Sequence, residues 1–132
     1  MKLTIFTDGG ARGNPGPAAA GVVIKNSEGK IIDAYGEYLG EQTNNYAEYS
    51  ALISGLKKSL SLGATEIECR LDSELVVKQM QRIYKVKEPT LQKLFVQAYN
   101  ASAAFKKVTF RHIARALNHE ADRLVNDTLD RR

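Results

Sequence analysis

The chain has 132 residues, of which 43% are hydrophobic and 26% are charged, a composition typical of one small globular domain. It contains no apolar run of about 18 residues, which excludes a transmembrane helix, and its start lacks the long apolar region of a signal peptide. Its one cysteine, Cys69, excludes an internal disulfide and suits a small buried side chain in a reducing cytoplasm, where we expect the protein to act. The net charge of +4 suits a polyanionic partner without demonstrating one.

The first part of the chain alternates strand patterns with turn residues. Residues 2–8 are predicted to form a strand, and the glycine- and proline-rich residues 9–17 a loop. Residues 19–25 and 30–38 have the alternation of strands, and the turn Asn26-Ser27-Glu28-Gly29 joins them into a hairpin.

The second part alternates helices with strands. The pattern predicts a helix from its cap Thr43 to about Leu60, a strand over 65–71, a short helix over 73–81, a helix over 90–103, a strand over 106–112 and a last helix over 118–129. This order predicts an α/β fold with a five-stranded mixed sheet, in which an antiparallel meander is extended by parallel strands and helices cover both faces. No linker or repeat interrupts the chain, so residues 1–132 are expected to form a single domain.

Four carboxylates lie where a metal site could form. Asp8 and Asp72 each end a predicted strand, Glu48 lies on one face of the first long helix, and Asp122 lies near the start of the last helix. Open α/β sheets gather their chemistry at the carboxyl ends of the strands. Converging carboxylates repel one another unless cations neutralise them, and Mg²⁺ prefers oxygen ligands. The pattern therefore indicates metal-dependent phosphate chemistry.

Each acid taken alone also has an ordinary structural interpretation. Asp8 could belong to a turn, Asp72 could cap the next helix, and Asp122 could interact with the positive end of the last helix. Glu48 is the hardest to explain in this way, because it shares a helix face with Leu52, where a lone carboxylate is unfavourable.

Four motifs together resemble the type 1 ribonuclease H family, in its short bacterial and archaeal form. They are Asp8-Gly9-Gly10, Thr43-Asn44-Asn45-Tyr46-Ala47-Glu48, Leu71-Asp72-Ser73 and Asn118-His119-Glu120-Ala121-Asp122-Arg123-Leu124. Each motif alone is weak, but the set is specific because order and spacing match along essentially the whole chain. The resemblance implies a ribonuclease H-like fold and hydrolysis of the RNA strand of an RNA–DNA hybrid, giving 5′-phosphate and 3′-hydroxyl ends.

The resemblance also implies two Mg²⁺ ions, for which Mn²⁺ can substitute. It implies that Asp8 bridges both ions, that Asp122 holds the ion on the side of the attacking water, and that Glu48 and Asp72 serve the leaving group. The implied substrate-binding residues are Gly9, Gly10, Arg12, Asn14, Thr43, Asn44, Asn45 and Gln79. Asparagine amides suit contacts to the 2′-hydroxyl that distinguishes RNA from DNA. Asn14 and the Asn44-Asn45 pair equally suit a turn and a helix start.

The chain departs from the family pattern in three places. Many members carry a catalytic histidine before the last helix, whereas this chain has Arg115 there, flanked by His112 and His119. Arg115 is a candidate for an electrostatic role in catalysis, with an exposed surface arginine as the alternative. A short connector over 84–89 stands where some members have a basic protrusion, which predicts weak and salt-dependent hybrid binding. Glu41 stands where some relatives have a basic phosphate contact.

Other functions remain compatible with the sequence. The same fold could cleave double-stranded RNA or a DNA junction, or act on a phosphomonoester, because a fold does not by itself define a substrate. A nucleic-acid-binding module without catalysis is a further alternative, although clustered carboxylates beside phosphate would weaken such binding. We expect a monomer that needs no membrane and no protein partner.

Overall fold

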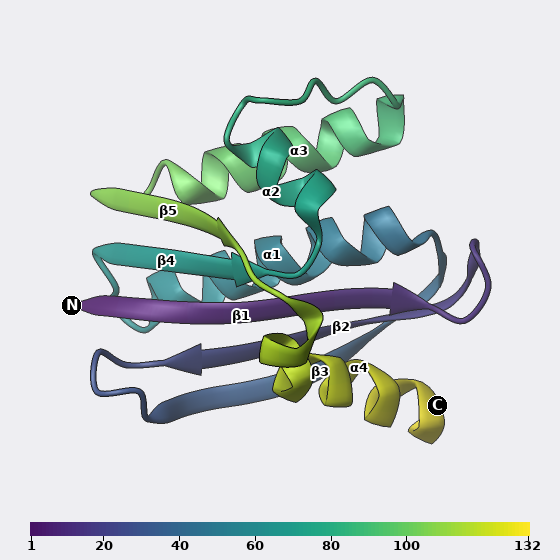
Figure 1. Ribbon diagram of the computed structural model, residues 1–132, viewed down its shortest axis with the longest axis horizontal. Coiled ribbons are helices and arrows are strands. Elements are labelled where there is room, and N and C mark those ends of the chain that lie inside the picture. Colours follow the sequence, from purple (N-terminus) through teal and green to yellow (C-terminus); the bar gives the residue numbers. More distant parts are fainter.

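One mixed sheet with helices on both faces forms the computed structural model, which describes residues 1–132 (Figure 1). The elements are β1 (Lys2–Ala11), β2 (Gly16–Lys25), β3 (Ile31–Gln42), α1 (Asn44–Ser61), β4 (Glu66–Leu71), α2 (Glu74–Met80), α3 (Pro89–Ser102), β5 (Lys107–His112), the 3₁₀ turn η1 (Arg115–Asn118) and α4 (His119–Arg131). The strand order is β3-β2-β1-β4-β5, antiparallel among β1, β2 and β3 and parallel among β1, β4 and β5. The predicted fold class is confirmed.

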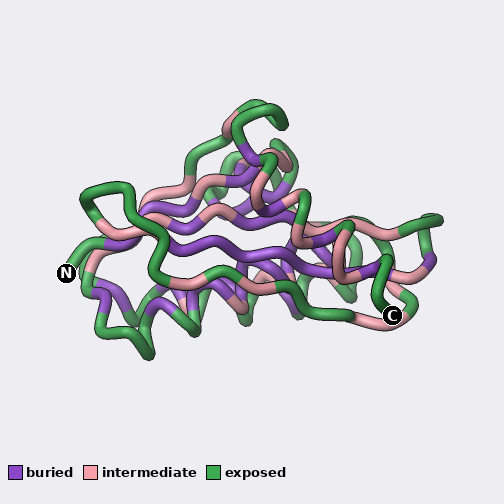
Figure 2. Tube along the Cα trace, turned by 90° about the horizontal axis from the view of Figure 1, so that it is seen from below, coloured by how far each residue is buried: buried purple, intermediate pink, exposed green.

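The larger core lies between the sheet and α1. Leu3 and Ile5 of β1 are fully buried and belong to a cluster of 18 buried residues that also includes Leu52 and Leu56 of α1. Each buried aliphatic side chain contributes about 1.5–3 kcal/mol. Figure 2 shows the strands in the middle of the molecule as largely buried, whereas the turns at its rim are exposed. This core fixes α1 against β1 and so determines where Glu48 lies.

Helix α4 packs on the opposite face of the sheet, over β2 and β3 (Figure 1). A second, small cluster joins Ala19 of β2 to Val125 and Leu129 of α4. Gly21 allows this close approach, because a Cβ there would overlap the backbone oxygen of Ala121. None of the α-helices combines the length and the apolar character that a membrane span requires.

The predicted loop over residues 9–17 is partly wrong. Strand β1 continues to Ala11 and β2 begins at Gly16, because Gly9 pairs with Ala20 and Gly10 with Ala19. Both glycines therefore lie within β1, where Gly9 is packed against α1, and only residues 12–15 form the connection. Strand β3 likewise continues to Gln42, beyond the predicted end at residue 38.

The segment between β5 and the last helix also differs from its prediction. Residues 115–118 form the 3₁₀ turn η1, and α4 begins at His119. Figure 1 shows this connection passing the end of β4 and crossing β1 before it reaches α4. The crossing brings Arg115 and Asn118 to the edge of the sheet where β1 and β4 carry their acids.

Candidate active site

Three carboxylates meet at one edge of the sheet. One oxygen each from Asp8, Glu48 and Asp72 lies within 4.8 Å of the other two. Asp8 and Asp72 meet because β1 and β4 are parallel neighbours in which Thr7 is opposite Leu71. Glu48 reaches the same point from the buried face of α1, where only 7% of the residue is exposed.

A glycine brings Glu48 close to Asp8. The Gly9 amide donates a hydrogen bond to the Glu48 carboxylate. A Cβ at position 9 would overlap the backbone carbonyl of Ala47, so only glycine permits this spacing of β1 and α1. The amide and the short spacing together hold the carboxylate of a core helix at the site.

Burial and mutual repulsion make these acids hard to ionise without a cation. The pKa of Asp8 is raised to about 7, chiefly by burial and next by the negative charge of Asp72, while hydrogen bonding with Glu48 opposes the rise. Burial likewise raises the pKa of Glu48 well above its usual range, with the charge of Asp8 as the next cause. A site of this kind favours a bound cation, because the cation stabilises the ionised carboxylates.

Asp72 is held by a hydrogen bond from Asn118. The buried Asn118 donates a hydrogen bond to the backbone oxygen of Thr7 (2.9 Å) and a longer one to Asp72 Oδ1 (3.4 Å). Ser73, and not Asp72, caps α2, since its hydroxyl accepts from the amide of Val76 (3.3 Å). The capping interpretation of Asp72 is therefore wrong.

Asp122 lies beside the group of three and not within it. It stands in the first turn of α4, as the helix-end interpretation requires, and it also raises the pKa of Asp8 by its charge and by a hydrogen bond. Arg115 Nη2 lies 3.6 Å from Asp122 Oδ1, and the Arg115 side chain is 80% exposed. Asn126, one helical turn further on, donates to the Asp122 backbone oxygen (3.1 Å) and approaches its carboxylate (3.5 Å).

The predicted asparagines surround the start of α1. The Asn14 amide oxygen accepts from the Asn44 amide (2.9 Å), and the Asn44 side-chain oxygen accepts from the Ala11 amide (2.8 Å). These bonds tie the β1–β2 connection to the helix, which agrees with the turn and helix-start interpretations. Asn45 lines the hollow that holds the carboxylates and also the neighbouring one, so its side chain lies between the two.

The other predicted substrate-binding residues lie in different places, some at the carboxylate hollow and some away from it. Gly10 and Arg12 line the carboxylate hollow, and Arg12 forms an ion pair with Asp130 of α4 (2.8 Å). Thr43 caps α1 through its hydroxyl, as predicted, and lines the neighbouring hollow. Gln79 is buried, accepts a hydrogen bond from the Tyr49 hydroxyl (2.6 Å), and lies apart from the acids.

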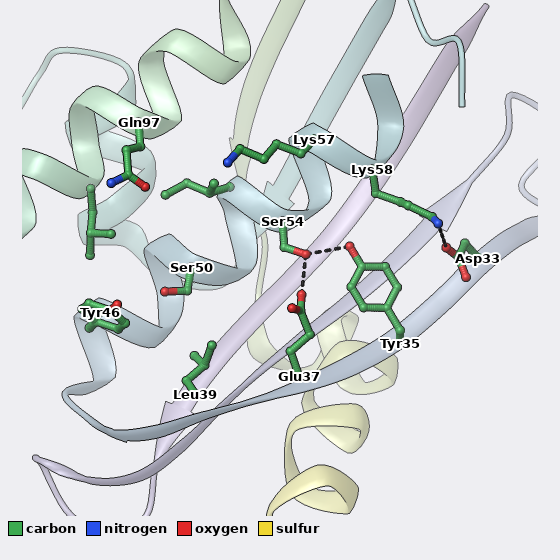
Figure 3. A pocket seen from close by; sticks show the side chains of 12 residues that line it. Asp33, Tyr35, Glu37, Leu39, Tyr46, Ser50, Ser54, Lys57, Lys58 and Gln97 are labelled. Atoms are coloured by element: carbon green, nitrogen blue, oxygen red, sulfur yellow. Dashed lines mark hydrogen bonds and ion pairs between the residues drawn. The ribbon is translucent and has the colours of Figure 1, made fainter. Parts of the chain in front are cut away.

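The carboxylates line a cleft of about 400 Å³, which is not the largest hollow in the molecule. A hollow of about 780 Å³ opens between β3 and the helices α1 and α3 (Figure 3). There Ser54 bonds the Tyr35 hydroxyl (2.8 Å) and donates to Glu37 (2.5 Å), a network that ties β3 to α1. We place the site at the smaller cleft, because converging carboxylates with perturbed pKa values mark chemistry better than volume does.

Comparisons with known proteins identify the family of this chain. The family described as "Reverse transcriptase-like" matches residues 6–128. "Ribonuclease HI" of Halobacterium salinarum is 41% identical over 129 residues, covering 98% of this chain and 65% of that protein. "Ribonuclease HI" of Caulobacter vibrioides is 32% identical over 142 residues, covering 97% of this chain and 93% of that protein.

The chain belongs to the type 1 ribonuclease H family. The crystal structure of RNase H1 from Halobacterium salinarum matches with a TM-score of 0.98 and 39% identity over 100% of both chains. LC11-RNase H1 in complex with an RNA/DNA hybrid matches with a TM-score of 0.93 and 46% identity, covering 98% of this chain and 97% of that one. "Bifunctional protein Rv2228c" of Mycobacterium tuberculosis is 46% identical over 131 residues, but this ribonuclease H chain spans only 36% of its length.

Two polar residues beside the acids were not predicted from the sequence. Asn118 appeared only as part of the last motif, and its partner Thr7 lies 111 positions away in the chain. Asn126 could have been found from its spacing, since it follows Asp122 by four residues on the same helix face.

Proposed function

We propose that residues 1–132 form a single ribonuclease H catalytic domain that cleaves the RNA strand of RNA–DNA hybrids with divalent metal ions. The observation that carries this proposal is the meeting of Asp8, Glu48 and Asp72 oxygens within 4.8 Å. The hybrid bound to LC11-RNase H1, a structure that this chain matches at a TM-score of 0.93, supports the substrate class.

The donor set of this cleft fits hard divalent cations. All candidate ligands are carboxylate oxygens, which Mg²⁺ and Mn²⁺ prefer, and no cysteine or histidine belongs to the group of three. Two such ions would supply an activated water and would neutralise charge on the leaving oxygen. Asp8 suits the bridging position because its pKa responds to each of the other three acids. Asp122 would then hold the water side, and Glu48 and Asp72 the leaving-group side.

The reaction is hydrolysis of a phosphodiester. Water attacks the phosphorus, the bond from phosphorus to the 3′ oxygen breaks, and the products carry a 5′-phosphate and a 3′-hydroxyl. The cleft must therefore orient the RNA backbone in line with the attacking water. Gly9, Gly10 and Asn45 border the acids. The Gly9 amide binds Glu48, and the Asn45 side-chain amide suits contacts to the 2′-hydroxyl and base edges.

Arg115 takes an electrostatic role in this proposal. It lies 3.6 Å from Asp122 and is mostly exposed, so it can reach a phosphate beside the acids without being consumed by a buried ion pair. Arg115→Ala should lower kcat, and Arg115→Lys should restore part of it because the charge returns. Equal rates for the wild type, Arg115→Ala and Arg115→Lys would show that Arg115 has no role in catalysis.

Cleavage of a strand-labelled hybrid tests the proposed function. We expect cutting of the RNA strand only, in Mg²⁺ or Mn²⁺, and its loss in Asp8→Asn. Asp127→Asn is the matched control. It also removes one negative charge, but Asp127 lies on α4 and does not line the cleft. Double-stranded RNA and DNA duplex measured alongside separate the alternatives: cutting of double-stranded RNA would widen the substrate class, and binding without cutting would favour a non-catalytic module.

Recognition and metal binding can be separated at Asn45. Asn45→Ala should lose cleavage while its metal affinity stays at the wild-type value, because its neutral amide is no metal ligand in this scheme. Loss of both properties to the same degree would contradict the recognition role.

A further inference from the structure

Part of the sheet has no helix over it. On the side where α4 lies, α4 covers β2, β3 and the part of β1 near Gly10, whereas the first half of β1, β4 and β5 have no helix over them (Figure 1). We call this surface the open face. The alternate residues of these strands, such as Leu3, Ile67 and Cys69, point into the core on the other side. The open face therefore consists of Lys2, Thr4, Phe6, Glu66, Glu68, Arg70, Lys107, Thr109 and Arg111.

The open face carries more positive than negative charge. Four of its side chains are cationic and two are acidic, which leaves a net charge of +2. Arg70 and Arg111 are cross-strand neighbours and share one carboxylate, since Glu68 Oε2 lies 2.5 Å from Arg70 Nε and 3.7 Å from Arg111 Nε. One carboxylate cannot neutralise two guanidinium groups, and the Arg111 side chain is 61% exposed. The pair therefore retains capacity for a second anion.

An aromatic ring lies at the corner of the open face that is nearest to the carboxylates. Phe6 is opposite Arg70 in the sheet, and the Arg70 guanidinium lies 5.3 Å from the centre of its ring. Lys25 of β2 lies over the same ring at 4.8 Å. Aromatic rings and guanidinium planes on an open sheet are the groups on which unpaired bases stack, while arginines bind phosphates.

The open face leads directly to the carboxylates. Phe6 and Asp8 lie on the same side of β1, and Arg70 and Asp72 are likewise two residues apart, a distance of about 6.6 Å along a strand. Only the connection that carries the exposed Arg115 crosses between them (Figure 1). Arg115 at the cleft and Arg70 and Arg111 on the open face therefore provide positive charge on the way from one to the other.

We propose that the open face binds single-stranded RNA that continues from the cleaved strand beyond the hybrid duplex. The inference rests on the proposed function, because that function delivers the RNA strand to Asp8 and Asp72. Unpaired nucleotides suit this surface better than duplex, since a base stacks on an aromatic ring or a guanidinium only when it is free of its partner strand. A tail tethered by the duplex also gains a high effective concentration at the face.

The test compares a blunt hybrid with the same hybrid carrying a ten-nucleotide overhang on either end of its RNA strand. Binding is measured over a fourfold range of salt in the Asp8→Asn background, which prevents cleavage. The test variant is Arg111→Gln with Lys107→Gln, which keeps the bond between Arg70 and Glu68. The matched control is Lys30→Gln with Lys57→Gln, which removes the same charge away from the open face.

We expect an overhang to tighten binding in the background protein and in the control, and the test variant to lose that gain. Loss of two phosphate contacts should reduce the slope of log affinity against log salt concentration by about 1.4 for the overhang substrate. Across a fourfold rise in salt, the protein with the unmodified face should therefore lose roughly sevenfold more affinity than the test variant does. No gain from either overhang, or equal loss in test variant and control, would overturn the inference while leaving the proposed function intact. Equally tight binding of a polyglutamate peptide would overturn it in favour of an acidic protein. Failure to bind the blunt hybrid would instead overturn the proposed function.

Discussion

Removing the charge of Asp8 should stabilise the metal-free protein at neutral pH. Its pKa rises from 3.8 to about 7 because burial and the charge of Asp72 disfavour the ionised form. At about 1.4 kcal/mol for each factor of ten in the dissociation constant, the penalty of ionising Asp8 in the folded state is on the order of 4 kcal/mol at most. Asp8→Asn keeps the size of the side chain and removes this penalty.

The sign of the pH dependence follows from proton binding. Between about pH 4 and pH 7 the unfolded chain has released the Asp8 proton while the folded protein keeps it. The folded state therefore binds more protons, and the free energy of unfolding of the wild type falls as pH rises through this window. The advantage of Asp8→Asn should be small near pH 4, grow with pH, and level off above about pH 7.

Urea denaturation in EDTA at several pH values measures this difference. Asp127→Asn is the control, and a surface change of this kind should stay within about 0.5 kcal/mol of the wild type. Saturating Mg²⁺ should reverse the order, because a ligand that binds only the folded state stabilises it and the substituted site binds metal weakly. The reasoning is refuted if Asp8→Asn in EDTA at pH 8 is no more stable than the wild type.

Two further predictions concern how the site is held together. Gly9→Ala should lose about 1–3 kcal/mol of stability and most of the cleavage rate, because its Cβ would overlap the backbone of Ala47. Gly10→Ala is the control, because a Cβ has room there and the change should be tolerated. Urea midpoints and cleavage rates of the two variants test this prediction. Asn118→Ala should lose about 1–3 kcal/mol of stability, because it removes the hydrogen bond to the buried Thr7 carbonyl. It should also show a smaller Mg²⁺-dependent rise in Tm, because Asp72 loses its hydrogen bond from Asn118. Wild-type values in both assays would contradict the positioning role of Asn118.

Much of the fold was predictable because the core follows local periodicity. The alternation in β1 and β4 and the helical spacing in α1 each identify a buried face, and those faces have to meet. Parallel pairing of β1 with β4 then brings Asp8 and Asp72 to one edge, as predicted from their places at strand ends. Glu48 was recognisable for the opposite reason, as a carboxylate on a helix face that otherwise belongs to the core.

The glycines were misread because glycine has two uses that look alike in a sequence. Gly9 and Gly10 follow an apolar strand, and a turn is the common meaning of such a pair. In the structure neither has a positive φ, and Gly9 stays in β1 to admit the backbone of α1. Whether such a glycine forms a turn or admits a neighbouring backbone depends on where α1 packs, and the residues near position 9 do not specify that packing.

Contacts between distant segments were out of reach for the same reason. Asn118 reads locally as the residue before a helix, yet its amide spans from β1 to the end of β4. Arg12 was expected only as a substrate contact, yet it also pairs with Asp130 of α4. Both cases involve polar side chains whose partners follow no periodic pattern. Periodicity specifies the apolar faces, and the assembled faces then determine which polar groups meet, so the acids of the site were predictable while the residues that orient them were not.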